Sequence, residues 1–213
     1  YMREERFVEA AAKWSRLSEM VQNEAYFVQQ WALCTYKSKY PSELKALTDA
    51  LTIIERISSL SDTETLGITG AINKNLWKST HDIVYLDTAI EYYKKGWSLY
   101  KDYYTGENYA QCIEYKALET GIDPEERTYY KIEGKKTRES VITVILKSLE
   151  VEEPEEVMWK YATLSNCYRG LGNESKATEY EYKFIQCSPK SCEISTFNIS
   201  KKEIEEYLIS NIK

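Results

Sequence analysis

One segment of the chain combines a bare helical surface with a single positive charge. Four positions share one face of a helix by their spacing of i, i+3, i+4 and i+7: Gly67, Gly70, Ala71 and Lys74. A glycine inside a helix costs about 1 kcal/mol relative to alanine, so two on one face need an explanation. One explanation is close packing against another helix. The other is a floor for a planar ligand or a phosphate, with Lys74 supplying the charge.

Lys37 and Lys39 add two positive charges at the end of another predicted helix. A positive charge at the C-terminal end of a helix interacts favourably with the helix dipole, and this alone accounts for one lysine. The other interpretation is phosphate recognition, in a groove that Lys74 also faces. The lysines are therefore candidate ligand-binding residues, with a structural role as the alternative.

The segment 102–108 precedes or opens a further helix and is rich in side chains that suit a nucleotide. The free N–H groups at the start of a helix can receive an anion. The ring of Tyr104 can stack on a base, and the amide of Asn108 can bind a base or ribose edge. Ordinary capping by Asp102 or Thr105 is about as compatible with the pattern. The candidate ligand-binding residues of this segment are Tyr103, Tyr104, Gly106 and Asn108.

The composition argues against several classes of function. The 213 residues carry 34 acidic and 28 basic side chains, for a net charge of −6, whereas nucleic-acid binders usually concentrate Lys and Arg. His81 is the single histidine, so the chain has almost no histidines from which to build a His-based zinc site or a Ser-His-Asp triad. No P-loop or dinucleotide-binding motif occurs, and the acidic run 150–156 lacks the spacing of a metal site. We therefore expect no catalytic residue, no metal, no cofactor and no DNA or RNA partner.

The cysteines and the apolar pattern bear on the compartment. The five cysteines are odd in number and form no C-x-x-C pair, which indicates reduced, mostly buried thiols in a cytoplasmic protein. No apolar stretch approaches the length of a membrane span, and no signal-peptide pattern opens the chain. Because Tyr1-Met2 leads directly into a helical pattern, we expect the sequence to be a fragment of a longer protein.

Helical periodicity dominates the chain and positions these candidate residues. Apolar residues recur at i, i+3, i+4 and i+7, as in the first run from Phe7 to Val21. The runs are separated by capping residues, by Pro41 and by turn glycines. Gly134 makes a break in the seventh predicted helix plausible. The pattern predicts about ten helices and no convincing strand, over residues 7–21, 24–39, 43–57, 64–79, 83–101, 105–119, 124–149, 154–169, 174–187 and 200–212, the last a capping helix that begins at Ser200.

A tetratricopeptide pattern occurs in the second half. Its bulky, small, aromatic, turn and terminal positions are filled in order by Tyr161, Leu164, Ser165, Tyr168, Gly172, Ala177 and Pro189. Glu181 departs from the pattern, because an aromatic residue is usual there. The small residues let paired helices pack closely, and stacked pairs bury each other's apolar faces. We predict an all-α, tetratricopeptide-repeat-like, right-handed superhelix of antiparallel helix pairs, forming a single solenoid domain over residues 1–213.

Four segments are more specific than a generic repeat. They are residues 29–39, 64–77, 86–96 and 102–110, which contain QQWALCTYKSK, ETLGITGAINKNLW, LDTAIEYYKKG and DYYTGENYA. Together they resemble tetratricopeptide-like sensor domains of bacterial conflict-system proteins, which are related to the TRAF-binding central regulatory domain of apoptosis-signal-regulating MAP kinase kinase kinases. The resemblance covers about residues 24–190. Asn75, Lys95 and Glu107 depart from the pattern, at two arginine positions and one apolar position.

The resemblance implies a non-enzymatic, ligand-sensing and regulatory role. Relatives are joined to effector modules such as TIR domains, phosphoesterases or kinases, and the domain has been proposed to sense nucleotide-derived ligands or to hold signalling partners. A nucleotide-derived small molecule and an effector domain are therefore the expected partners, and no membrane is expected. The alternative is a scaffold that binds a peptide or partner subunit without a small molecule. The sequence leaves the oligomeric state open.

Overall fold

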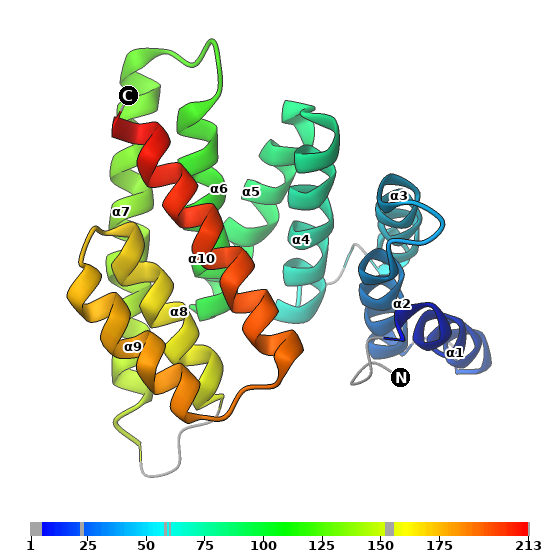
Figure 1. Cartoon of the computed structure of the whole chain (residues 1–213). Coiled ribbons are helices and arrows are strands. Elements are labelled where there is room, and N and C mark those ends of the chain that lie inside the picture. Colours follow the sequence, from blue (N-terminus) through cyan, green and yellow to red (C-terminus); the bar gives the residue numbers. More distant parts are fainter. Residues whose placement is uncertain (1–5, 22–23, 58, 60, 152–155, 213) are drawn as a thin grey trace. The chain divides into compact units, whose positions relative to one another are not determined.

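A computed structural model describes residues 6–21, 24–57, 59, 61–151 and 156–212 of the chain (Figure 1). The described residues form ten α-helices and one short 3₁₀-helix, with no strand among them. The α-helices are α1 (Phe7–Met20), α2 (Ala25–Ser38), α3 (Glu43–Ile54), α4 (Thr63–Thr80), α5 (Ile83–Tyr100), α6 (Tyr103–Leu118), α7 (Pro124–Ser148), α8 (Val157–Gly170), α9 (Glu174–Gln186) and α10 (Ser191–Ile212). The predicted all-α class is confirmed, and most helix ends lie close to the predicted ones.

One helix differs from the prediction, and the break that seemed plausible in another is absent. The helix predicted over residues 124–149 is confirmed as one continuous helix, and Gly134 within it leaves room for Glu114: an added Cβ would come 2.9 Å from Cγ of that glutamate. The last helix begins at Ser191, so Ser200 lies inside it and not at its N-cap. Ile194 and Phe197 explain the longer helix, since both pack in an apolar cluster with Ala162 and Phe184.

The chain groups into two compact units, Tyr1–Tyr100 and Lys101–Lys213, which are described separately. The single solenoid domain over residues 1–213 stays a prediction. In the first unit, α2, α3 and α4 share an apolar core that includes Ala32, Leu47 and Leu76. Local caps start two of these helices: the Ser42 side chain accepts from Lys45 N–H, and Asp62 accepts from Thr65 N–H.

The second unit contains two antiparallel pairs, α6 with α7 and α8 with α9, and α10 packs on α8 and α6 (Figure 1). The α8–α9 pair has the predicted tetratricopeptide contacts. Ser165 Oγ donates to the carbonyl of Ala177 at 2.9 Å, which is the close approach that a small residue allows. The rings of Tyr168 and Tyr180 stack with their centroids 5.6 Å apart. Gly172 turns the chain with a φ of 74°, a conformation that favours glycine.

All five cysteines are free, and three of them, Cys34, Cys112 and Cys167, are buried. Burial raises the pKa of Cys34 from 9.0 to about 11. Cys187, by contrast, is exposed at the end of α9.

We expect Cys187 to be modified first by a maleimide at pH 8 in the folded protein. The thiolate is the reacting species, and a pKa of about 11 in place of 9.0 lowers the thiolate fraction of Cys34 by about 100-fold at this pH. Peptide mapping after timed labelling measures each site, and labelling in urea is the control. Equal labelling rates of Cys34 and Cys187 in the folded chain would contradict this expectation.

Among the described residues, none of the helices combines the length and apolarity that a membrane span requires. Within the same residues, no group of three or more His, Cys, Asp and Glu side chains is arranged to hold a metal ion.

Candidate functional site

The predicted ligand-binding residues divide between the two units. Lys37, Lys39, Gly67, Gly70 and Lys74 belong to the first unit, and Tyr103, Tyr104, Gly106 and Asn108 belong to the second. Each group is described within its own unit.

Lys37 and Lys39 both have local contacts at the end of α2. Lys37 is exposed, and its ammonium lies 5.9 Å from the centroid of the Phe7 ring. Lys39 is the C-cap residue with a left-handed φ of 52°, and its Nζ lies 2.9 Å from Oε1 of Glu43. Both side chains are accessible, and a phosphate at Lys39 would compete with the Glu43 carboxylate.

Close packing against a neighbouring helix explains one of the two glycines of α4. Gly67 and Gly70 are buried, whereas Lys74 is half-buried. A Cβ added at Gly70 would meet the ring of Tyr93 on α5 at 2.8 Å. Close helix packing therefore accounts for Gly70. A ligand-binding role for Gly67, Gly70 and Lys74 stays a prediction.

Gly70→Ala is expected to destabilise the first unit by up to about 2 kcal/mol. Alanine favours the helix by about 1 kcal/mol, but overpacking a fixed core costs about 1–3 kcal/mol, and the Tyr93 ring that the new methyl group would meet is fully buried. Urea unfolding measures the difference. In a Tyr93→Ala background the same change is expected to be neutral or stabilising. Stabilisation by Gly70→Ala in the wild-type chain would refute the packing role.

A hollow of about 240 Å³ lies within the first unit, between α3, α4 and α5. Its lining is mostly aromatic, aliphatic and neutral polar: Leu51, Ile54, Glu55, Thr69, Asn73, Val84, Tyr85, Thr88 and Tyr92. Thr69 and Asn73 are nearly fully buried, and Asn73 Nδ2 donates to the carbonyl of Thr69 at 2.9 Å. The tyrosine rings suit a planar group, and the amide and hydroxyls suit hydrogen bonding to its edge. The single charged lining residue, Glu55, makes the hollow better suited to a base than to a phosphate.

None of these lining residues was among the predicted site residues. The one signal that pointed to them is the excess of tyrosine, 19 residues in all, to which Tyr85 and Tyr92 contribute.

The segment 102–108 forms the first turns of α6 in the second unit. Asp102 is the N-cap residue and accepts from Thr105 N–H at 2.8 Å, so the capping interpretation is confirmed. Tyr103 donates its hydroxyl proton to Glu156 Oε2 at 2.7 Å, and burial raises its pKa. Tyr104 is 44% exposed, and Asn108 Nδ2 donates to the carbonyl of Tyr104 at 2.9 Å. Gly106 is buried inside the helix.

A buried polar group that sequence reasoning missed links α6 to α8. Glu107 accepts from Thr163 Oγ1 and from Asn166 Nδ2, both at 2.7 Å. Asn166 Nδ2 also lies 3.2 Å from Ser200 Oγ of α10. Glu107 is one of the departures from the family pattern, and its burial shows that the replaced apolar position has become a polar contact between helices.

A second buried group joins α6 to α7. Arg138 donates from Nε and Nη2 to the two oxygens of Glu114 at 2.7 and 2.6 Å, and the arginine side chain is fully buried. Burial disfavours the charged guanidinium, but the carboxylate of Glu114 outweighs it and raises the pKa of Arg138. Gly170 leaves room for this pair, because a Cβ there would come 2.5 Å from Arg138 Nε.

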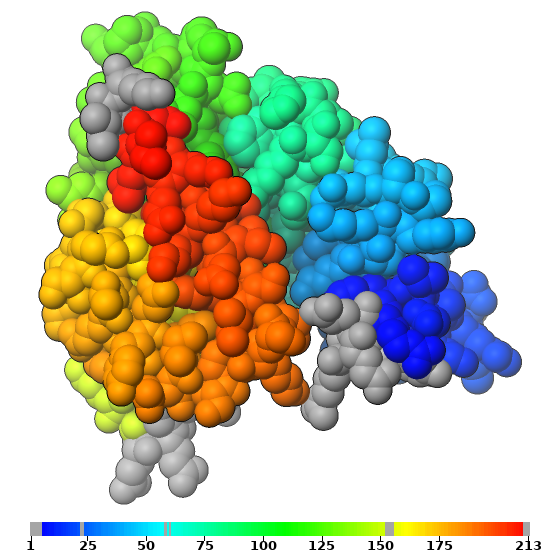
Figure 2. All heavy atoms as spheres, viewed as in Figure 1, coloured from blue at the N-terminus to red at the C-terminus, as the bar shows by residue number. Residues whose placement is uncertain are grey.

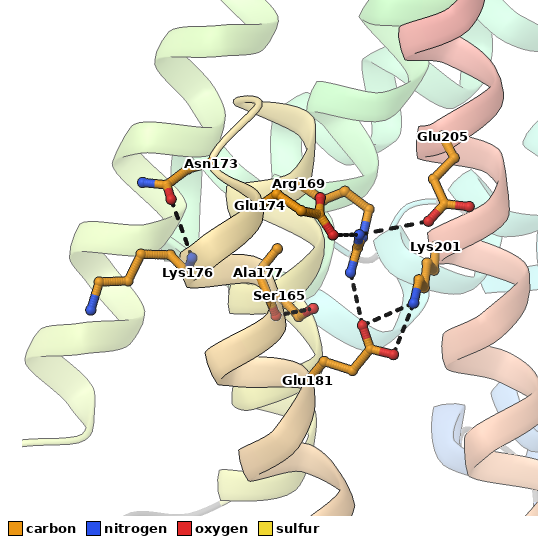
Figure 3. Close-up of polar contacts among 9 residues, drawn as sticks. All are labelled: Ser165, Arg169, Asn173, Glu174, Lys176, Ala177, Glu181, Lys201 and Glu205. Atoms are coloured by element: carbon orange, nitrogen blue, oxygen red, sulfur yellow. Dashed lines mark hydrogen bonds and ion pairs between the residues drawn. The ribbon is translucent and has the colours of Figure 1, made fainter.

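A third cluster connects α8, α9 and α10 through Arg169, as Figure 3 shows. Arg169 pairs with Glu174 through Nη1 and donates from Nη2 to Glu181 at 2.8 Å. Glu205 of α10 lies 3.6 Å from Nη1, and Lys201 of α10 donates to both oxygens of Glu181 at 2.9 Å. Glu181 stands at the position where the repeat usually has an aromatic residue, so here an ionic cluster replaces an aromatic contact.

A comparison with known families connects this geometry to a class of proteins. A model of the family described as Tetratricopeptide Repeats-Sensor (TPR-S) matches residues 6–113, which is just over half of the 213 residues. The chain belongs to the TPR-S family. No curated protein and no solved structure gives a significant match to it.

The TPR-S match covers α1 to α5 and most of α6. All the predicted ligand-binding residues lie inside it, as does the hollow lined by Tyr85 and Tyr92. Membership in the TPR-S family supports one part of the resemblance, namely that the chain is a tetratricopeptide-like sensor domain. The chain is accordingly a tetratricopeptide-like regulatory domain.

Proposed function

We propose that this TPR-S chain is a non-enzymatic domain that binds a nucleotide-derived ligand and controls an effector linked to it. The observation that carries the proposal is the family match over residues 6–113, which contains both the predicted ligand-binding residues and the hollow. The host would be a cytoplasmic bacterial immune or stress-signalling protein, in line with the resemblance to conflict-system domains and to the kinase regulatory domain.

The chemistry of the first unit supports a nucleotide as the ligand class. The hollow offers two tyrosine rings and the buried Asn73 amide for a base. Its volume of about 240 Å³ is below the roughly 300–1,000 Å³ of drug-sized sites, so it suits one part of a ligand. Lys37, Lys39 and Lys74 are the proposed source of charge for a phosphate. A ligand that fits one arrangement of the helices better would shift the population toward it, and the effector would respond to that shift.

Calorimetry and thermal shift with NAD, ADP-ribose, cyclic nucleotides and dinucleotides test this function. One of these ligands is expected to raise the melting temperature of the chain. Tyr92→Ala is expected to weaken its binding about tenfold or more, because stacking is worth about 1–3 kcal/mol per base. Tyr182→Ala is the matched control, since that tyrosine is 65% exposed on α9. A folded chain that binds none of these ligands would overturn the proposal.

A second candidate function is a scaffold that holds a peptide or a partner protein. The observation in its favour is that α10 packs on α6 and α8, so these two helices already hold another helix through polar contacts such as that of Gln111 with Glu203. This role needs no small molecule.

A further inference from the structure

Besides its two tyrosines, the hollow of the first unit is lined by four polar side chains, those of Glu55, Thr69, Asn73 and Thr88. The helices around it, α3, α4 and α5, are the part of the chain coloured light blue to green in Figures 1 and 2. A polar side chain selects a ligand through the protons it can donate and the lone pairs it can offer. The hydrogen bonds that these four side chains already make therefore determine which ligand edge suits the hollow.

The two threonine hydroxyls have already used their protons. Thr69 Oγ1 donates to the carbonyl of Thr65 at 2.7 Å, and Thr88 Oγ1 donates to the carbonyl of Val84 at 2.8 Å. Each bond lies within one helix, between residues four positions apart. Because a hydroxyl has a single proton, both oxygens can offer a ligand only lone pairs.

Asn73 and Glu55 add further acceptors. Asn73 Nδ2 donates to the carbonyl of Thr69 at 2.9 Å, which uses one of its two N–H groups and leaves Oδ1 as an acceptor. Asn73 is 2% exposed, and a buried polar atom without a partner costs free energy. Glu55 is the C-cap residue of α3, and its carboxylate only accepts when ionised. All four side chains thus offer acceptors, whereas the remaining donors are one N–H of Asn73 and the two tyrosine hydroxyls.

This excess of acceptors distinguishes between nucleobases, which the tyrosine rings do not. Every base has a π-face, so stacking on Tyr85 and Tyr92 tolerates any of them. The edges differ, because the exocyclic amines of adenine and cytosine donate N–H groups, whereas the carbonyl of a thymine-type base at the corresponding position only accepts. A carbonyl in the hollow would bring acceptor against acceptor, and such an unfavourable contact is what rejects a wrong ligand.

We propose that the hollow recognises a nucleobase by its exocyclic amine and rejects the counterpart without that amine. Adenine, cytosine and guanine share this group, which donates to the acceptor oxygens just described, while the ring stacks on tyrosine. The inference rests on the proposed function, since it names the part of the nucleotide that the hollow takes.

Calorimetry of the wild-type chain with matched nucleotides tests the inference. AMP and IMP differ by the amine at C6, GMP and IMP by the amine at C2, and CMP and UMP by the amine at C4. NAD and its hypoxanthine analogue extend the comparison to dinucleotides. In at least one pair the amino member is expected to bind at least about tenfold more tightly, because its counterpart leaves buried acceptors unpaired.

Three outcomes would contradict the inference, and they separate it from the proposed function. Equal affinities within every pair that binds would overturn the inference alone, since the chain would still be a nucleotide sensor. Binding of no nucleotide would overturn both. Binding of agmatine without any nucleotide would also overturn both, because the acceptors and tyrosine rings would then serve a guanidinium cation.

Glu55→Gln tests the carboxylate. The new amide supplies N–H donors that a carbonyl can use, so the preference for the amino member is expected to fall by about threefold or more. Glu91→Gln removes the same charge from an exposed position of α5 outside the lining, and it should keep the wild-type preference. An unchanged preference in Glu55→Gln would contradict a role of this carboxylate in choosing the base.

Thr88→Val removes one acceptor and keeps the shape of the side chain. It is expected to weaken the amino member by about threefold or more and to leave its counterpart unchanged. Thr143→Val of α7 is the matched control, since Thr143 Oγ1 also donates to a carbonyl four residues earlier, that of Glu139 at 3.0 Å. Equal weakening of both members would show that Thr88 acts only through packing. The wild-type ratio decides the inference by itself, so the test does not depend on the folding of any variant.

Discussion

Arg138→Ala is expected to lower the free energy of unfolding of the second unit by about 3–5 kcal/mol. The substitution leaves the carboxylate of Glu114 buried without its guanidinium partner, and breaking one side of a buried ion pair costs this much. Urea unfolding followed by far-UV circular dichroism measures the loss, and hydrogen exchange assigns it to α6, α7 and α8.

Two further variants distinguish the loss of stability due to the buried ion pair from the loss due to removing any charged side chain. Lys176→Ala removes one partner of the exposed Lys176–Glu179 pair and should cost less than about 1 kcal/mol. Replacing both buried partners, as Arg138→Met with Glu114→Leu, should recover much of the loss, because no unpaired charge then remains. An Arg138→Ala chain within about 1 kcal/mol of wild type would show that the pair is not what stabilises the packing of α7.

Phe184→Ala is expected to cost about 3–5 kcal/mol as well, for a different reason. The Phe184 side chain is fully buried, and its ring lies 4.8 Å from that of Phe197 on α10 and 6.4 Å from that of Trp159 on α8. Truncation leaves a cavity that these neighbours fill only in part.

The same urea experiment measures this second loss, and hydrogen exchange should show faster opening of α10, because Phe197 loses its closest ring. Tyr182→Ala on the exposed side of α9 is the control, expected within about 0.5 kcal/mol of wild type. Unchanged exchange of α10 in Phe184→Ala would mean that Phe197 does not anchor it.

Local chemistry made most of the fold predictable. The N-caps at Ser42 and Asp62 depend on a side chain and an amide three residues apart, so they can be read from neighbouring residues. The α8–α9 repeat was also predictable, since its small and turn residues occur at fixed offsets within one helix pair.

The missed features depend on residues far apart in the chain. Glu114 and Arg138 are 24 positions apart, and Glu107 and Asn166 are 59 apart, so no local pattern marks either pair. Ser200 has the residue type of an N-cap, but Asn166 and the apolar cluster at Phe197 place it inside α10. The pair of Lys39 and Glu43 is an exception, since the two residues are only four positions apart. It connects the end of α2 to the start of α3, so the spacing within one helix does not predict it.

The contact between Arg138 and Gly170 has a consequence for the geometry of the repeat. Here a flat charged group on α7 lies against the bare backbone of α8, so a guanidinium serves as the spacer. A side chain at position 170 would therefore have to displace this guanidinium or move α7 away from α8.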